Sequence, residues 1–166
     1  MKKKIIVLGI VLFLLVGCSM ANTPSSNVEA LLMKYQKVDM DINNGIDTVL
    51  DEQNFTDAHR ERYRKIIEKQ YKNLSYEIKD EKIDGDRATV IVEIEVTDYK
   101  GAISDLTFDS SIYTKESFDE EKLNRLENAS GKVKYTLELS LTKDSDDVWK
   151  LDALTEEQIK KIQGMY

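Results

Sequence analysis

The chain contains few of the residues that build most catalytic and metal sites. Its 166 residues include one cysteine, one histidine, one tryptophan and one proline. A single cysteine forms no intrachain disulfide, and a zinc site with one histidine would depend on carboxylates, which is uncommon. The sequence also lacks a Gly-x-Ser-x-Gly segment, a phosphate-binding loop and a dinucleotide-binding glycine pattern. We therefore expect no catalytic residue, no cofactor and no metal.

A long hydrophobic run is missing too, although a short one lies at the start of the chain. Three lysines at positions 2–4 precede an apolar run from Ile5 to Val16, which is followed by Gly17 and Cys18. A membrane-spanning helix needs about 20 apolar residues, so this run is too short. The charged start, the short run and the small residue before Cys18 predict a signal peptide at residues 1–17.

The segment Leu15-Val16-Gly17-Cys18 resembles the lipobox of bacterial lipoproteins, which are cleaved before the cysteine. The resemblance implies that diacylglycerol is attached to Cys18 and that the exported protein is anchored at the outer face of the cytoplasmic membrane. Two acyl chains suit this anchor, because burial contributes about 0.8 kcal/mol per CH₂ and one chain holds only marginally. The alternatives are an ordinary cleaved signal with an incidental cysteine, and an uncleaved anchor.

Acidic side chains outnumber basic ones by 31 to 24, a net charge of −7. Residues 1–17 carry three lysines and no acid, so residues 18–166 carry −10. This balance argues against a nucleic-acid partner and against docking on anionic lipid by charge alone. The expected partners are membrane lipid, through diacylglyceryl-Cys18, and a protein or small molecule that the sequence does not identify.

The first part of the chain predicts a tether and two helices. Residues 18–27 are polar and contain Pro24, which predicts a lipidated N-terminus and a flexible tether ahead of a single domain at 28–166. Apolar residues recur in steps of three and four from Val28 to Leu50, which predicts one long amphipathic helix. The same period from Thr56 to Leu74 predicts a second helix.

Alternation of apolar and polar residues then predicts four antiparallel strands in two pairs. The first pair flanks an Asp-Gly turn at 84–85, and the second covers 133–141 and 149–153. Val92 and Leu137 are expected to face the helices, while Glu93 and Glu138 face solvent. Residues 98–113 fit no period.

Two capping boxes mark the remaining helices. Ser117 with Glu120 predicts the start of a helix that Gly131 ends, and Thr155 with Gln158 predicts the start of the last helix. The predicted order is helix, helix, strand, strand, helix, strand, strand, helix. This order indicates an α+β fold with an antiparallel sheet of about four strands packed against helices.

The whole chain resembles small lipoproteins of low-GC Gram-positive bacteria with a cystatin-like or nuclear-transport-factor-two-like domain, a family of unknown function. The resemblance rests on the lipobox, the long leading helix, the strand that ends in Asp98-Tyr99, and the closing segments 148–151 and 161–166. It implies the fold but no activity, because this fold carries enzymes, ligand carriers and interaction modules alike.

Three groups of side chains are candidates for chemistry, each with a plainer explanation. His59, one turn before Tyr63, is either a base in a pocket or a half-buried helix histidine. Glu93 and Glu95 share a strand face as an acid–base pair or as part of a solvated surface. Trp149 and the eight tyrosines line a ligand cavity or, more simply, fill the core.

Asp39, Asp41 and Asn43 faintly resemble a calcium-binding loop. The glycine at 45 is one position late and the twelfth position is Leu50 rather than glutamate. An acidic, solvated helix face is the plainer interpretation.

Two functions from different classes fit these observations. The favoured one is a membrane-anchored, non-enzymatic binding or interaction module. The other is a small-ligand carrier or enzyme that uses a cavity between the curved sheet and the first two helices. A deep cavity lined by polar groups such as His59 would favour the second.

Overall fold

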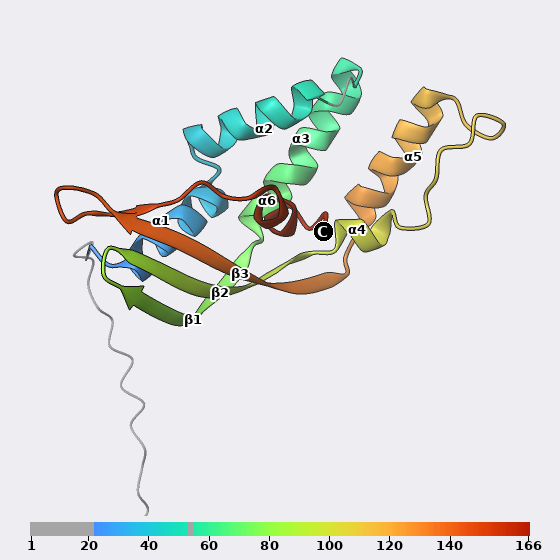
Figure 1. Cartoon of the computed structure of the whole chain (residues 1–166). Helices are drawn as coiled ribbons and strands as arrows, with labels where there is room; N and C mark the ends of the chain where they lie inside the picture. The colour runs from blue at the N-terminus through green and yellow to red at the C-terminus, as the bar shows by residue number, and fades with distance from the viewer. Residues whose placement is uncertain (1–21, 53–54) are drawn as a thin grey trace, which may run out of the picture.

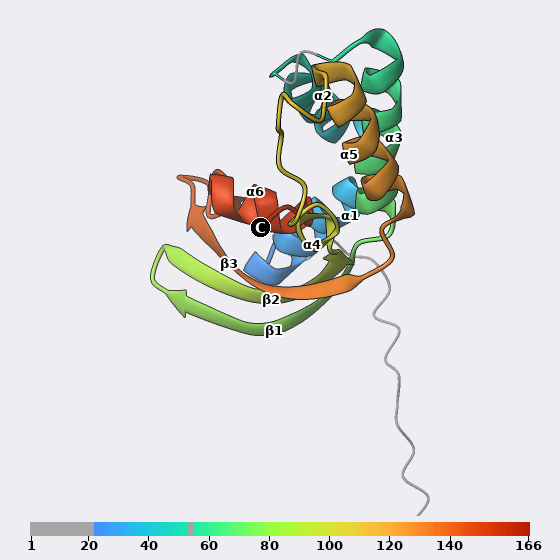
Figure 2. The same ribbon diagram turned by 90° about the vertical axis from the view of Figure 1, so that its right-hand side faces the viewer.

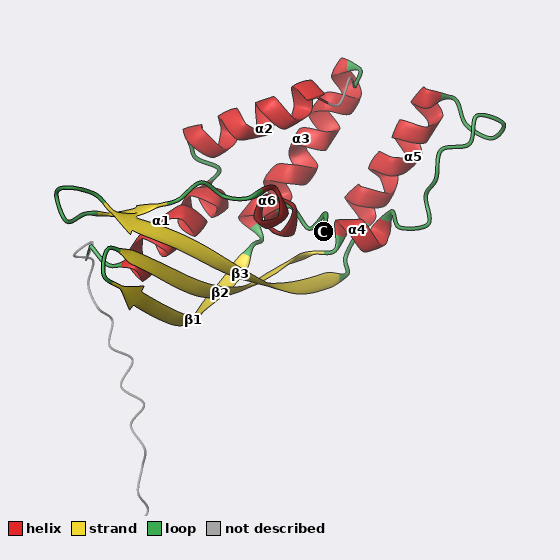
Figure 3. Cartoon of the chain, in the orientation of Figure 1, coloured by secondary structure: helices red, strands yellow, loops and turns green. Residues whose placement is uncertain are grey.

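The protein is an α+β domain built on one four-stranded antiparallel sheet (Figures 1 and 3). The computed structural model describes residues 22–52 and 55–166, so the predicted signal peptide and Cys18 lie outside the described residues. Within that part of the chain, no helix has both the length and the apolar composition needed to cross a membrane. The elements are α1 (Pro24–Lys37), α2 (Met40–Glu52), α3 (Asp57–Lys72), β1 (Ser75–Asp84), β2 (Arg87–Thr97), α4 (Tyr99–Ala102), α5 (Lys115–Asn128), β3 (Lys132–Lys143), β4 (Trp149–Leu151) and α6 (Glu156–Ile162).

The strands lie in the sheet in chain order, and the predicted register of the central pair is confirmed. Val92 of β2 lies opposite Leu137 of β3, and both are buried. Glu138 is exposed, and Glu93 is on the same outer face. The Asp-Gly turn joins β1 to β2 as predicted, with Gly85 in the left-handed region at φ 59°.

Helices α1 and α6 cover the inner face of the sheet, and none of the described helices covers the outer face (Figure 2). Leu32 of α1, Ile162 of α6 and Val90 of β2 are fully buried at this contact. Helix α6 also lies beside the part of β3 that the short β4 leaves unpaired. There the Gln158 side chain donates to the Glu138 carbonyl at 2.7 Å. The alternation that predicts a strand to residue 153 overestimates β4, which ends at Leu151.

The predicted tether at 18–27 is wrong for its second half, because α1 begins at Pro24. Thr23 is the N-cap and forms a capping box with Ser26. Proline suits the first turn of a helix, where its missing N–H is not needed. Asn22 is already bound to the domain: its side chain donates to the Asp147 carbonyl at 2.8 Å and accepts from the Trp149 N–H at 3.0 Å.

The predicted single long helix is two helices. Val38 takes a left-handed conformation (φ 49°) and ends α1, and the Asp39 side chain then accepts from the Ile42 N–H at 3.1 Å. Aspartate is a favoured residue at an N-cap, because its carboxylate accepts a hydrogen bond from an otherwise free N–H at the start of the helix. The apolar period does not reveal the break, because the buried side of α2 keeps the spacing of α1.

The capping box predicted at Ser117 and Glu120 is also wrong, because α5 begins three residues earlier. Thr114 is the N-cap, and its partner is Ser117. The helix ends at Asn128 with Ala129 as the C-cap, before Gly131. The Thr155–Gln158 capping box of α6 is confirmed. The aperiodic region begins with the short α4, capped by Asp98, whose side chain accepts from the Gly101 N–H at 2.7 Å.

Helices α2, α3 and α5 form a helical lobe that rises from one end of the sheet (Figures 1 and 2). The C-terminal half of α3, its lower part in Figure 1, joins this lobe to the sheet. There the Tyr35 and Tyr71 rings pack edge to face at 4.9 Å, and the Tyr99 hydroxyl donates to the Ile66 carbonyl at 3.2 Å. The upper part of α3 lies between α2 and α5.

Candidate functional site

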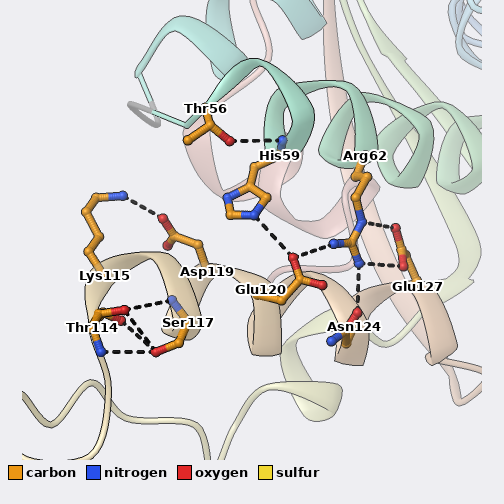
Figure 4. Close-up of polar contacts among 10 residues, drawn as sticks. All are labelled: Thr56, His59, Arg62, Thr114, Lys115, Ser117, Asp119, Glu120, Asn124 and Glu127. Carbon is orange, nitrogen blue, oxygen red and sulfur yellow. Dashed lines mark hydrogen bonds and ion pairs between the residues drawn. The ribbon is translucent and has the colours of Figure 1, made fainter.

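A dense group of interacting polar side chains lies between α3 and α5 (Figure 4). We call it the α3–α5 clasp. Helix α3 contributes two residues three positions apart, and α5 contributes three at spacings of four and three, so each set lies on one helix face. Its members are His59, Arg62, Glu120, Asn124 and Glu127.

Arg62 is the centre of the clasp. Its Nε and Nη2 donate to the two carboxylate oxygens of Glu127, both at 2.8 Å. Its Nη1 donates to Glu120 Oε2 at 2.7 Å, and Nη2 also donates to Asn124 Oδ1 at 2.8 Å. The planar guanidinium suits this forked binding. Hydrogen bonds from Arg62 hold the pKa values of both carboxyl groups below their usual range.

His59 completes the clasp from the first turn of α3. Thr56 caps this helix by accepting from the His59 N–H. The imidazole is buried, and its Nε2 lies 3.2 Å from Glu120 Oε2. The Phe55 ring packs edge-on against it. A carboxylate beside a histidine orients a general base in many enzymes, but here the same oxygen also binds Arg62. The arrangement therefore joins two helices rather than presenting a base to solvent.

His59 and Tyr63, the pair predicted from the sequence, both pack on the Phe55 ring. The polar Nε2 atom of His59, however, is directed to Glu120 of α5. Burial raises the pKa of the Tyr63 hydroxyl. The partners of His59 come from α5, about sixty residues away, so the sequence offers no local signal for them. Arg62 and Glu127 can be recognised as members of the clasp only once α3 and α5 are known to be adjacent.

The suggested calcium loop is the first half of α2. Asp39 caps the helix, Asp41 binds Lys34 at 3.1 Å, and Asn43 accepts from Arg64 at 3.0 Å. These oxygen atoms are thus bound to groups of the chain itself. Across residues 22–52 and 55–166, no cluster of three or more histidine, cysteine, aspartate or glutamate side chains is placed to hold a metal ion.

Glu93 and Glu95 lie on the outer face of the sheet beside a small open hollow of about 170 Å³. Glu93 accepts from Lys134 at 2.9 Å, and this bond holds the pKa of its carboxyl below the usual range. An acid–base pair needs one carboxyl with a raised pKa, so Glu93 is poorly suited as the proton donor of such a pair.

Trp149 is buried in the core, and the Lys143 ammonium lies over its ring at 5.2 Å. Four of the eight tyrosines are buried as well: Tyr35, Tyr63, Tyr71 and Tyr99. These aromatic side chains take part in packing, in agreement with the plainer of the two interpretations.

A larger hollow than the one beside Glu93 lies in the loop of residues 103–114, which we call the distal loop. It has a volume of about 630 Å³ and is open to solvent. Ile112 is 72% exposed and Phe108 50% exposed, and the Phe108 ring packs edge-on against Phe118 of α5. Arg125 borders the hollow and binds Asp105 at 2.6 Å. In the sequence, this surface is marked only by apolar residues that follow neither the helix nor the strand period.

Comparison of the chain with protein families, with curated proteins and with solved structures found no match in any of the three. The interpretation of these surfaces therefore rests on the residues themselves.

Proposed function

We propose that this protein is an exported, membrane-anchored lipoprotein that acts as a non-enzymatic interaction module on the outer face of the cytoplasmic membrane. Diacylglycerol on Cys18 is the anchor, and the support for it is the sequence of the first eighteen residues. The partner is a protein that binds at the distal loop.

One observation carries the interaction role. The first described residues and the distal loop lie at opposite ends of the domain (Figure 1). An anchor at the N-terminus therefore leaves the loop accessible. Two large apolar side chains exposed beside an open hollow are a common feature of protein-binding surfaces.

The contacts of the candidate catalytic side chains support a binding function over an enzymatic one. In the α3–α5 clasp, His59 and Arg62 direct their polar atoms to carboxylates of α5. The alternative of a ligand carrier or enzyme with a cavity under the sheet has less support. Val28, Leu32 and Val92 are fully buried where the sheet meets α1.

We also propose that the domain has a cystatin-like or nuclear-transport-factor-two-like fold. The antiparallel sheet in chain order, with α1 across its inner face, supports this fold. The separate helical lobe is an addition to that arrangement.

The test places a photoreactive amino acid at Ile112 in the full chain, or at Glu156 as a control, and irradiates intact cells. We expect a defined cross-linked protein in the membrane fraction from position 112 and none from position 156. Phe108→Asp should abolish that product, because it places a charge in the apolar surface. Identical products from both positions, or a product unaffected by Phe108→Asp, would contradict binding at the distal loop.

The anchor is tested separately by metabolic labelling with a fatty-acid analogue. The parent chain should incorporate the label, and Cys18→Ala should not. Equal labelling of the two chains would contradict lipid attachment at Cys18.

A further inference from the structure

The chain enters the domain between two β-turns. We call them together the turn end: residues 84–87, between β1 and β2, and residues 144–148, between β3 and β4. Asn22 is bound to the second of these turns through Asp147 and the adjacent Trp149. One turn of helix later, the Ser25 N–H and hydroxyl donate to Glu81 of β1 at 2.8 and 2.5 Å. The start of the domain is thereby held at this end of the sheet.

The chain between the proposed anchor and this fixed point is short. Cys18 lies four residues before Asn22, and four residues span at most about 14 Å. An uncleaved anchor that ends at Val16 would be six residues away, or at most about 22 Å. Strand β3 alone has 12 residues and spans about 40 Å. The connection is therefore much shorter than the domain, and it keeps the turn end near the bilayer.

The side chains of the turn end are compatible with a position near the bilayer, but their charge does not attract them to anionic lipid. Ile83, beside the first turn, and Val148, the last residue of the second, are large apolar residues that are 56% and 40% exposed. The turns themselves carry five aspartates and one arginine: Asp84, Asp86, Asp144, Asp146, Asp147 and Arg87. Asp147 and Asp144 form ion pairs with Lys143 and Lys150, and the other three aspartates still outnumber Arg87. The remaining excess of carboxylates is repelled by anionic headgroups, so the anchor rather than surface charge determines the contact. The same repulsion acts on the rest of the acidic domain and opposes lying flat.

We propose that the turn end faces the bilayer, with Ile83 and Val148 at headgroup level, and that the domain stands with the distal loop directed away from the membrane. The partner of this surface is the lipid bilayer. The inference rests on the proposed N-terminal anchor and adds the orientation of the domain relative to it.

The experiment uses the full chain, produced in a host that processes lipoproteins and reconstituted into phosphatidylcholine vesicles. A maleimide fluorophore is attached at Asp146→Cys in the turn end or, as the matched control, at Ser110→Cys in the distal loop; both positions are exposed. A short-range quencher is carried on the lipid headgroups. We expect strong quenching of the probe at 146 and none at 110. Equal quenching, or stronger quenching at 110, would overturn the orientation.

Failure of the anchor gives a different result. An acylated Cys18 does not react with maleimide, so labelling of the parent chain together with its loss from the vesicles would overturn the proposed function and this inference together. A chain that stays on the vesicles but shows no contrast between the two positions overturns the orientation alone.

A second measurement tests the short connection as the cause. Twenty Gly and Ser residues inserted before Asn22 have a root-mean-square length of roughly 25 Å. Quenching at 146 should then fall, and it should fall further when anionic lipid replaces part of the phosphatidylcholine at low salt. Quenching that stays unchanged with the long linker would show that the turn end binds lipid by itself, which overturns the proposed mechanism.

Discussion

At the scale of single residues, the contact between Gly164 and the end of β2 leaves no room for a side chain. The Gln70 amide is buried and holds Thr97 from both sides, accepting from its N–H and donating to its carbonyl, each at 3.0 Å. Gly164 lies against these groups with φ 69°, and its carbonyl accepts from the Lys100 N–H at 2.8 Å. A side chain at position 164 would collide with the Thr97 carbonyl and the Gln70 amide.

Gly164→Ala should therefore lower the stability substantially. Strained backbone of this kind costs roughly 1–3 kcal/mol before any collision is counted. At this chain length each kcal/mol corresponds to about 2–4 °C in Tm. Thermal unfolding followed by circular dichroism measures the effect. Gly131→Ala is the matched control, because a Cβ there would meet nothing nearer than the Asp98 Cβ at 4.0 Å. Equal losses in the two variants would contradict the close contact at Gly164.

At the scale of elements, the sequence predicts the strands better than the helix boundaries. Each central strand has one buried face, so its side chains alternate, and Val92 and Leu137 lie where that alternation places them. Helix boundaries depend instead on single caps. Ser117-x-x-Glu120 fits the usual capping-box pattern with glutamate in third place, yet the box that forms is Thr114-x-x-Ser117. Local sequence therefore favours the wrong start for α5.

Contacts between elements explain the rest of what the sequence could not predict. Glu120 is available to α3 because α5 starts at Lys115, and that pairing depends on how two distant helices pack. The distal loop was not predicted at all, since Phe108 and Ile112 serve no repeating buried face.

The α3–α5 clasp should give the stability a specific pH dependence. Arg62 lowers the pKa values of Glu120 and Glu127 in the folded chain. Carboxyl groups of this kind stabilise the fold above their unfolded pKa, near 4.3, and lose that contribution as pH falls through the lower folded value. Arg62→Ala should thus unfold at lower urea concentration than the parent at pH 7, and the difference should shrink between about pH 5 and pH 3.

The control for this prediction is Arg87→Ala, which removes an exposed arginine of the β1–β2 turn, far from the clasp. It should leave the pH dependence of the parent unchanged. A difference between Arg62→Ala and the parent that stays constant from pH 7 to pH 3 would contradict a stabilising contribution from the ionised clasp.

At the scale of the whole molecule, the domain has two unequal parts. In the sheet and its covering helices, β2 pairs along its length with β1 and β3 and is covered on one side. In the helical lobe, α2 packs mainly on α3, and α5 packs on α3 and the short α4. The lobe is joined to the sheet chiefly through the lower part of α3.

This difference predicts an order of local opening, since elements with fewer packed neighbours exchange their amide protons first. Hydrogen–deuterium exchange followed by mass spectrometry should show α2 and α5 exchanging before β2 and β3. Arg62→Ala should accelerate α5 while leaving β2 nearly unchanged at neutral pH. Uniform exchange of all elements at one rate would contradict this order and indicate a single cooperative unit.

The two edges of the sheet determine whether neighbouring copies of the domain can associate by strand pairing when they are crowded together. Along β3, α6 occupies the stretch that β4 leaves unpaired, with Gln158 bound to the Glu138 carbonyl. Along β1, a bulge between Ile78 and Asp80 interrupts the register, and the strand carries charged side chains over most of its length. Within the described sheet, neighbouring copies therefore find no flat edge strand on which to polymerise. We expect a membrane surface to hold this domain at high density without seeding fibrils.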